Sequence, residues 1–157
     1  MEPTTQLYVS QRLKLNYVMW GRKEAPKVVL IHGGRDHARN WDQTAETLSS
    51  EYCVIAPDLR GHGDSAWAEG GSYSIIDYVL DLNALFHAED IQEASLIGHS
   101  LGGSIALQYA GAFPEQVDRV VSIEGVARMQ GRENQRKPAH ERLRQWVNDM
   151  RSLEVRN

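Results

Sequence analysis

The strongest constraint on the fold of this chain is a set of short, mainly apolar runs separated by segments long enough to form helices. The runs lie at residues 28–31, 53–56 and 94–97, and residues 117–123 are expected to form a fourth buried strand. Apolar runs of this length are typical of strands covered on both faces of a parallel sheet. The pattern predicts an α/β fold, a mostly parallel sheet with helices on both faces.

Two further kinds of element complete the expected sheet. Residues 7–20 alternate in part and contain no strong breaker, so they are expected to form one or two antiparallel strands at the sheet edge. Helices are expected over about 41–50, 75–87 and 101–113. Ser74 is a suitable N-cap for the second of these helices.

Composition and charge exclude several classes of protein. The 157 residues suit a single domain of the usual ~100–150 residues. The net charge of −4 argues against binding to nucleic acid. No apolar run reaches the ~20 residues that span a bilayer, so a membrane is not an expected partner either. Metal-ligand spacing of His, Cys, Asp and Glu is missing as well, and no cofactor is expected.

The cellular compartment is predicted from the cysteine content and the N-terminus. Cys53 is the single cysteine, so the chain forms no internal disulfide. The first residues lack the basic and apolar regions of a secretory signal. A reducing cytoplasm is therefore the expected location.

The charge is unevenly divided along the chain. Residues 1–127 hold nine Lys/Arg and seventeen Asp/Glu, whereas residues 128–157 hold eight and four. We expect the first part to be the folded core and the second to be a basic helical segment. Acids and bases alternate in that segment, which favours a solvated helix face over a docking arm.

The clearest chemical signal is Gly98-His99-Ser100-Leu101-Gly102, a G-x-S-x-G sequence between an expected strand and an expected helix. A nucleophilic serine has to project from a tight, strained strand-to-helix turn. Side chains at the two glycine positions would collide with the neighbouring strand and helix. The start of the helix directs backbone N–H groups at the reacting atoms, so the Leu101 amide can stabilise an oxyanion.

Two other motifs directly follow expected strands. His32-Gly33-Gly34 follows the first buried strand, and Asp58-Leu59-Arg60-Gly61-His62-Gly63-Asp64-Ser65 follows the second. Three motifs in this order make the chain resemble the α/β-hydrolase superfamily from about Tyr8 to Gly125. The resemblance implies that the chain is the N-terminal portion of such a fold.

The resemblance also implies roles for individual residues. Ser100 would be the nucleophile, and the amides of Leu101 and Gly34 would form the oxyanion hole. With a serine at this position, the chain resembles the esterase, lipase, lactonase and carbon–carbon bond hydrolase branches of the superfamily. Dehalogenases and epoxide hydrolases of the superfamily carry an aspartate there instead.

The base that such a serine needs is not identifiable. Members of the superfamily place an acid and then a histidine after the serine, the histidine following the last strand of the sheet. This sequence ends at Asn157, which is two strands earlier, so we expect a C-terminally truncated hydrolase. His140 is the only histidine downstream of Ser100. None of the six fits the base well: His32, His37, His62, His87, His99 and His140.

Glu124 is the candidate for the acid, because it follows the fourth expected strand at the end that lines the ligand crevice of a parallel sheet. This arrangement resembles that of some α/β-hydrolases, which place their acid after this strand and not after the next one. The alternative is that Glu124 is a solvated carboxylate or binds a neighbouring loop. Asp36 and Asp58 are expected to fix loops by accepting backbone hydrogen bonds.

The sequence leaves three functional hypotheses open. The first is ester-type hydrolysis of a small-molecule substrate through Ser100, weak or absent in this chain without the histidine. The second is a non-catalytic interaction module, or half of a split hydrolase, that self-associates through the open edge of the fourth strand. The third is a fragment of a longer protein. Residues 128–157 resemble the start of the lid that relatives insert here.

Overall fold

The sheet determines the architecture of the molecule. The computed structural model describes residues 2–125 and Arg144, and within them six strands form one sheet in the order β1-β2-β4-β3-β5-β6. β1 and β2 run antiparallel to their neighbours, and the other four strands run parallel to one another. The strands are β1 Thr4–Ser10, β2 Leu13–Trp20, β3 Lys27–Ile31, β4 Cys53–Pro57, β5 Ala94–His99 and β6 Val117–Ile123. The predicted sheet and its antiparallel edge are confirmed.

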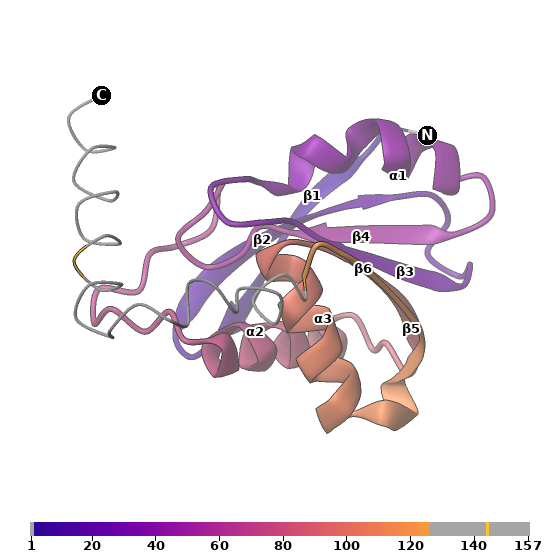
Figure 1. Cartoon of the computed structure of the whole chain (residues 1–157). Coiled ribbons are helices and arrows are strands. Elements are labelled where there is room, and N and C mark those ends of the chain that lie inside the picture. The colour runs from indigo at the N-terminus through magenta and orange to yellow at the C-terminus, as the bar shows by residue number, and fades with distance from the viewer. Residues whose placement is uncertain (1, 126–143, 145–157) are drawn as a thin grey trace. The chain divides into compact units, whose positions relative to one another are not determined.

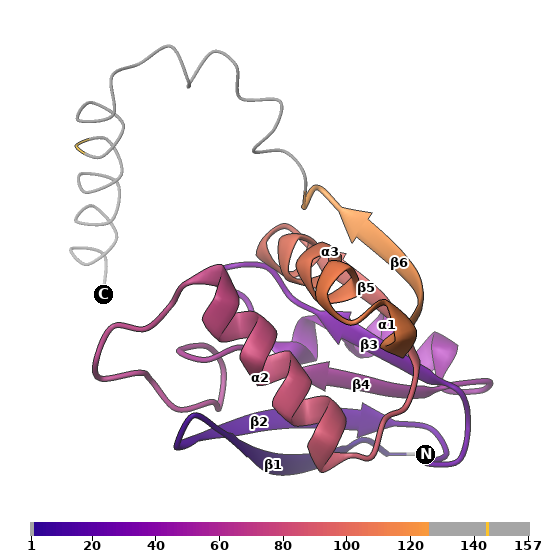
Figure 2. The same cartoon turned by 90° about the horizontal axis from the view of Figure 1, so that it is seen from below.

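Helices cover both faces of this sheet, as predicted. Figure 1 shows α1 on one face and α2 and α3 on the other, and Figure 2 views the face that carries α2 and α3. None of the helices among the described residues is long and apolar enough to cross a bilayer. The helical elements are η1 Ala38–Trp41, α1 Asp42–Leu48, α2 Ile75–Ala88, α3 Leu101–Ala112 and η2 Pro114–Gln116.

The predicted basic segment of residues 128–157 falls almost wholly outside the described residues. The chain divides into two units, residues 1–126 and 127–157. Of the second unit the structure describes Arg144 alone, which is helical and exposed. The expectation of a lid-like helical segment therefore stays a prediction.

Ser74 caps α2, as the sequence predicts. The Ser74 hydroxyl accepts a hydrogen bond from the Asp77 amide at 3.3 Å, and the Asp77 carboxylate accepts one from the Ser74 amide at 2.9 Å. This reciprocal pair satisfies two amides that would otherwise lack partners at the helix start.

The central strands are apolar on both sides because each side faces a separate core. Val29 and Ile55 point into the cluster under α2 and α3, whereas Val28 and Val54 point into the cluster under α1. All four are buried. Successive side chains of a strand alternate between the faces of a sheet, so a strand covered on both faces has no position for a solvated residue.

β6 differs from its prediction in burial. The strand forms where expected and pairs in parallel with β5. However, Val121 is 50% exposed and Ile123 is 42% exposed, so the expectation of a fully buried strand is wrong. α3 packs against β6 on one side only, and no strand pairs with the outer edge of β6 among the described residues.

A buried ion pair joins the loop after β4 to α2. The Arg60 guanidinium donates to both carboxylate oxygens of Asp81, at 2.6 and 2.7 Å, and also to the Ser72 carbonyl at 2.8 Å. The side chains of Arg60 and Asp81 are 1% and 2% exposed. The Asp81 carboxylate raises the pKa of Arg60 above its usual value. This two-bond geometry fixes the path of the loop over residues 60–72.

Removing one charge of this pair should destabilise the fold severely. Asp81→Asn would remove the carboxylate that binds the buried Arg60 guanidinium through two hydrogen bonds and leave only Asp77, 3.5 Å from Nη1, as a counter-charge. We expect the free energy of unfolding to fall by about 3–5 kcal/mol. Urea denaturation followed by circular dichroism measures the change. Arg39→Gln is the control, because it breaks the exposed Arg39–Asp42 pair and should cost less than about 1 kcal/mol. Equal effects of the two substitutions would contradict the stabilising role of the Arg60–Asp81 pair.

Candidate active site

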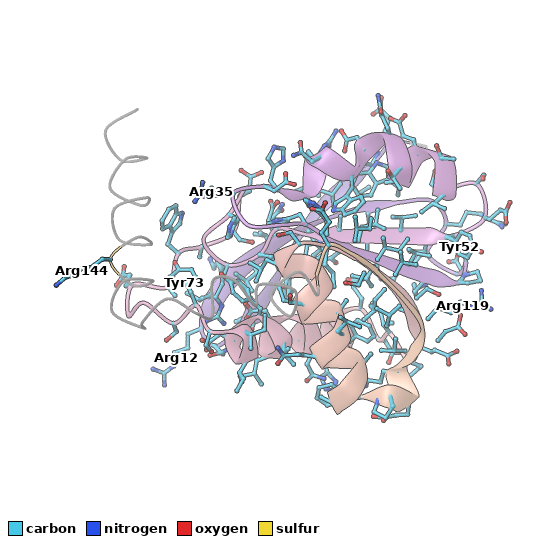
Figure 3. All side chains as sticks on the ribbon, in the orientation of Figure 1. Arg12, Arg35, Tyr52, Tyr73, Arg119 and Arg144 are labelled. Atoms are coloured by element: carbon cyan, nitrogen blue, oxygen red, sulfur yellow. The ribbon has the colours of Figure 1, made fainter. Side chains whose placement is uncertain are left out.

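The loops that carry the three sequence motifs leave the sheet at the same edge. β3, β4 and β5 are parallel, so residues 32–36, 58–65 and Ser100 all follow their strands on that side. Figure 3 shows Arg35 at this edge and Tyr52 and Arg119 at the opposite one. In open α/β sheets ligands bind at the carboxyl ends of the strands.

Ser100 occupies a strained position between β5 and α3. Its backbone has φ 51° and ψ −112°, in a region that side-chain-bearing residues rarely adopt. Such a conformation costs of order 1–3 kcal/mol and persists only where the surroundings enforce it. The Ser100 amide donates to the Ile123 carbonyl at 2.7 Å, and the Ser104 amide donates to the Ser100 carbonyl at 3.2 Å. Both neighbours hold the turn, and the serine itself is exposed.

The two glycines around Ser100 permit a close approach of backbones. A Cβ atom on Gly98 would lie 2.3 Å from the Gly102 carbonyl oxygen. A Cβ atom on Gly102 would lie 2.1 Å from the Ile31 carbonyl oxygen. Both distances are far inside van der Waals contact, so the start of α3 can lie against β3 and β5 only with glycine at these positions. The prediction that side chains at both glycine positions of the G-x-S-x-G motif would collide with the neighbouring strand and helix is therefore confirmed.

The first amide of α3 and the loop after β3 both lie close to Ser100. Leu101 begins α3, and among the described residues its amide has no hydrogen-bond acceptor, as is usual for the first turn of a helix. The loop after β3 approaches the serine closely, because a Cβ atom on Gly33 would lie 3.3 Å from the Ser100 Cβ. The position of a Cβ atom on Gly34 is open to within 4 Å. The oxyanion roles of Leu101 and Gly34 stay predictions.

His32 anchors this loop, which agrees with its expected structural role. Its Nε2 accepts a hydrogen bond from the Leu59 amide at 2.9 Å, so the ring proton lies on Nδ1 and is donated to the Gly33 carbonyl at 2.6 Å. Burial lowers the pKa of His32 below its usual value, with the nearby His62 acting in the same direction. The neutral ring thus joins the loop after β3 to the loop after β4.

Asp58 and Asp36 fix loops, as predicted. The Asp58 carboxylate accepts hydrogen bonds from the Ala38 amide at 2.7 Å, the Asn16 side chain at 2.8 Å and the Asp64 amide at 3.0 Å. Asp36 accepts one from the His37 amide at 2.8 Å and another from the side chain of Asn40. Neither carboxylate is needed to explain chemistry at the serine.

Glu124 lies beside the nucleophile but is not buried. It directly follows Ile123, whose carbonyl accepts the Ser100 amide. Its carboxylate is 76% exposed and lies 3.7 Å from Nε2 of His99. The position is compatible with the acid of a catalytic triad and with the solvated alternative. Its φ of 61° shows that the chain turns sharply there.

His99 lines a pocket of about 270 Å³ beside the candidate site. The pocket is lined by Asp36, Asn40, Trp41, His99 and Ile123. Trp41 packs with the cluster on the α1 side of the sheet, so the imidazole of His99 lies toward that face. Sequence reasoning missed this pocket, because no local pattern brings the turn after β3 to the ends of β5 and β6.

No histidine among the described residues hydrogen-bonds to the Ser100 hydroxyl. His32 and His62 lie against each other, with ring centroids 5.2 Å apart, and the Nδ1 of His62 is 3.0 Å from the Arg60 carbonyl oxygen. His37 and His87 are exposed, as predicted. His140 lies outside the described residues. The described residues thus place the Ser100 hydroxyl at the start of α3 without a histidine in hydrogen-bond contact with it.

Comparison with known proteins identifies the family. The model of the alpha/beta hydrolase fold family matches residues 26–153, which is most of the chain. The chain therefore belongs to the alpha/beta hydrolase fold family. It is 39% identical over 98 residues to the uncharacterized protein Rv2715 of Mycobacterium tuberculosis. It is 31% identical over 107 residues to a probable serine hydrolase of Drosophila melanogaster, and 34% identical over 119 residues to Lipase LipV of Mycobacterium tuberculosis.

Solved structures agree with this assignment. A thioesterase domain from the curacin biosynthetic pathway has a TM-score of 0.74 and 27% identity, over 78% of this chain and 46% of that one. Epoxide hydrolase VrEH1 from Vigna radiata has a TM-score of 0.73 and 28% identity, over 77% and 39%. The structural neighbours thus include enzymes of different reaction types.

The chain spans less than half the length of these curated relatives. The matches cover 62%, 67% and 76% of this chain but 28%, 32% and 44% of Rv2715, the Drosophila protein and LipV. The similarity therefore covers only part of each relative, and the activities of the whole relatives do not transfer with it.

A side chain placed where the start of α3 approaches β3 should destabilise the fold. Gly102→Ala places a methyl group against the Ile31 carbonyl, and we expect it to lower the free energy of unfolding by about 1–3 kcal/mol. Gly111→Ala is the control in the same helix, because its Cβ would meet nothing within 4 Å. It should stabilise the protein by up to about 1 kcal/mol through helix propensity. Thermal melts compare the two, and a stabilising Gly102→Ala would refute the packing described.

Proposed function

We propose that the protein is a serine hydrolase of ester-type bonds in which Ser100 is the nucleophile. The observation that carries the proposal is the conformation of Ser100, an exposed serine held at positive φ at the start of α3. Strain of this kind concentrates at functional sites. Membership of a family that contains serine hydrolases and a lipase supports the same reaction class.

The proposed reaction begins with attack of the Ser100 oxygen on a substrate carbonyl. The negative charge that develops on the carbonyl oxygen is stabilised by the amides of Leu101 and Gly34, and the dipole of α3 adds to this. The leaving alcohol departs and the resulting acyl-serine is cleaved by water. Each serine-acyl bond is an ester, which the same donors can activate a second time.

The chemistry of serine favours acyl transfer over epoxide opening. Attack of a hydroxyl on a saturated carbon would form an ether, which has no carbonyl for water to attack. The enzyme would be trapped after one turnover. Among the reactions of its structural neighbours, the one that Ser100 can complete is therefore hydrolysis at a carbonyl.

The proton of Ser100 requires an acceptor, because a neutral hydroxyl is a weak nucleophile. We assign Glu124 as the acid that orients a histidine base, in keeping with its place beside the Ser100 amide at the end of β6. The base approaches from outside the described residues. Its sources are His140, a further segment of a longer protein, or a second chain. The cytoplasmic location stays a prediction from the single cysteine.

Labelling with a fluorophosphonate probe tests the nucleophile. We expect the probe to modify Ser100 in the presence of added imidazole, which replaces the base. Without imidazole the rate should be about 10²-fold lower, because general-base catalysis typically contributes 10²–10⁴-fold. Mass spectrometry of the digested protein locates the label.

Two serine variants make this experiment decisive. Ser100→Ala should abolish labelling. Ser104→Ala should leave it nearly unchanged, since the Ser104 hydroxyl is engaged with the Gly125 carbonyl at 2.5 Å. Labelling that persists in folded Ser100→Ala, or its absence from the wild type with imidazole present, would refute the proposed function.

The second candidate function is an interaction module that self-associates through β6. The observation that favours it is the exposure of Val121 and Ile123 on a strand that is outermost in the described sheet. Edge strands with apolar side chains readily pair with another chain. The proposed partner is a second copy of the protein.

Light scattering at micromolar concentration tests this candidate. We expect a dimer for the wild type and a monomer for Val121→Glu, because a carboxylate on the exposed face of β6 would have to be buried in the interface. Ile76→Glu is the control, since Ile76 is 65% exposed on α2, which contacts β1 at the opposite edge of the sheet. A monomeric wild type, or equal dissociation by both variants, would rule the candidate out.

A further inference from the structure

A second hollow, distinct from the pocket lined by His99, lies beside the β1–β2 hairpin. It has a volume of about 480 Å³, within the range of sites that hold small organic ligands. Two cations, a carboxylate and an indole surround it. The lining residues are Arg12, Leu13, Lys14, Ala66, Trp67 and Glu69.

Two segments that are far apart in the sequence build this hollow. The Ala66 amide donates to the Lys14 carbonyl at 3.0 Å, and the Asn16 amide donates to the Ser65 hydroxyl at 2.8 Å. The Gly61 amide also donates to the Ala66 carbonyl at 3.0 Å. These bonds hold the loop before α2 against the start of β2. They therefore fix the backbone that places Trp67 next to the two cations.

Arg12 is held in an unfavourable backbone conformation. Gln11 and Arg12 form the hairpin turn with φ 47° and 69°, a geometry for which Asn-Gly is the preferred pair. A side-chain-bearing residue in the left-handed region costs roughly 1–2 kcal/mol. The turn alone does not explain an arginine here. Figure 3 shows that the Arg12 side chain extends outward from the molecule.

The two cations of the hollow have no ion-pair partner among residues 2–125. In the same part of the chain the side chains of Lys23, Arg39, Arg60 and Arg119 all lie within 4.0 Å of a carboxylate. Arg12 and Lys14 do not, and neither do Arg22, Lys27 and Arg35, but of these five unpaired cations only Arg12 and Lys14 line the hollow. Unpaired cations that flank a hollow attract an anionic group.

Trp67 adds a second kind of contact. The indole is 72% exposed, and it is the most exposed of the large apolar side chains in the described residues. A tryptophan in solvent beside cations offers a flat face on which a planar ring can stack. Glu69 would repel a bare anion, but its carboxylate can accept hydrogen bonds from hydroxyl groups.

We propose that this hollow binds a nucleoside phosphate. Arg12 and Lys14 bind the phosphate, Trp67 stacks on the base and Glu69 accepts from the ribose hydroxyls. β2 begins beside the carboxyl end of β4, since Tyr17 pairs with Pro57, so the hollow opens at the same sheet edge as Ser100. The binding is independent of the hydrolase chemistry proposed for that serine.

Isothermal titration calorimetry of the whole chain with ADP, adenosine and inorganic pyrophosphate tests the proposal. ADP should bind saturably with one site per chain, more tightly than either of the other two compounds. Raising the salt concentration should weaken the binding of ADP, because the contacts to phosphate are exposed.

Variants at the exposed positions separate the contributions without threatening the fold. Arg12→Gln with Lys14→Gln should weaken ADP binding at least tenfold, and Trp67→Ala should do so roughly tenfold. Arg22→Gln is the matched control, since Arg22 is an exposed arginine at the other end of β2, and it should leave the affinity unchanged. The absence of saturable ADP binding, or equal affinity in the wild type and the double variant, would overturn the proposal. Pyrophosphate binding as tightly as ADP would also overturn it.

Discussion

The contact between the start of α3 and strands β3 and β5 is the constraint on which the rest of the structure depends. Gly98 and Gly102 allow backbone atoms to approach to distances that no side chain would permit. This approach places the first amides of α3 and the loop after β3 on either side of one serine. The packing of α3 on the central sheet and the geometry of the candidate active site therefore depend on the same backbone contact.

The loops around that serine are held by polar groups buried at the carboxyl ends of the strands. His32 links the loop after β3 to Leu59, and Asp58 gathers three donors from separate segments. Buried polar networks of this kind are rigid only when every group has its partner. The loops of the candidate site are thus fixed by the protein's own hydrogen bonds, as the proposed electrostatic stabilisation of a transition state would require.

Much of this could be predicted because it is local in the sequence. The short, mainly apolar runs mark β3, β4 and β5, and the serine motif marks the turn between β5 and α3. What could not be predicted depends on residues that meet only in the fold. Arg60 lies in a polar loop and would be expected in solvent, yet it is buried against Asp81. The burial of β6 was overestimated, because its apolar residues resemble those of the covered strands.

The backbone of Ser100 has a consequence for how such a chain can change over generations. Its positive φ is a conformation that glycine adopts without strain and serine does not. A population selected for thermal resistance alone would drift toward glycine at this position and lose the hydroxyl. At this position stability and the chemistry proposed for the hydroxyl therefore favour different residues.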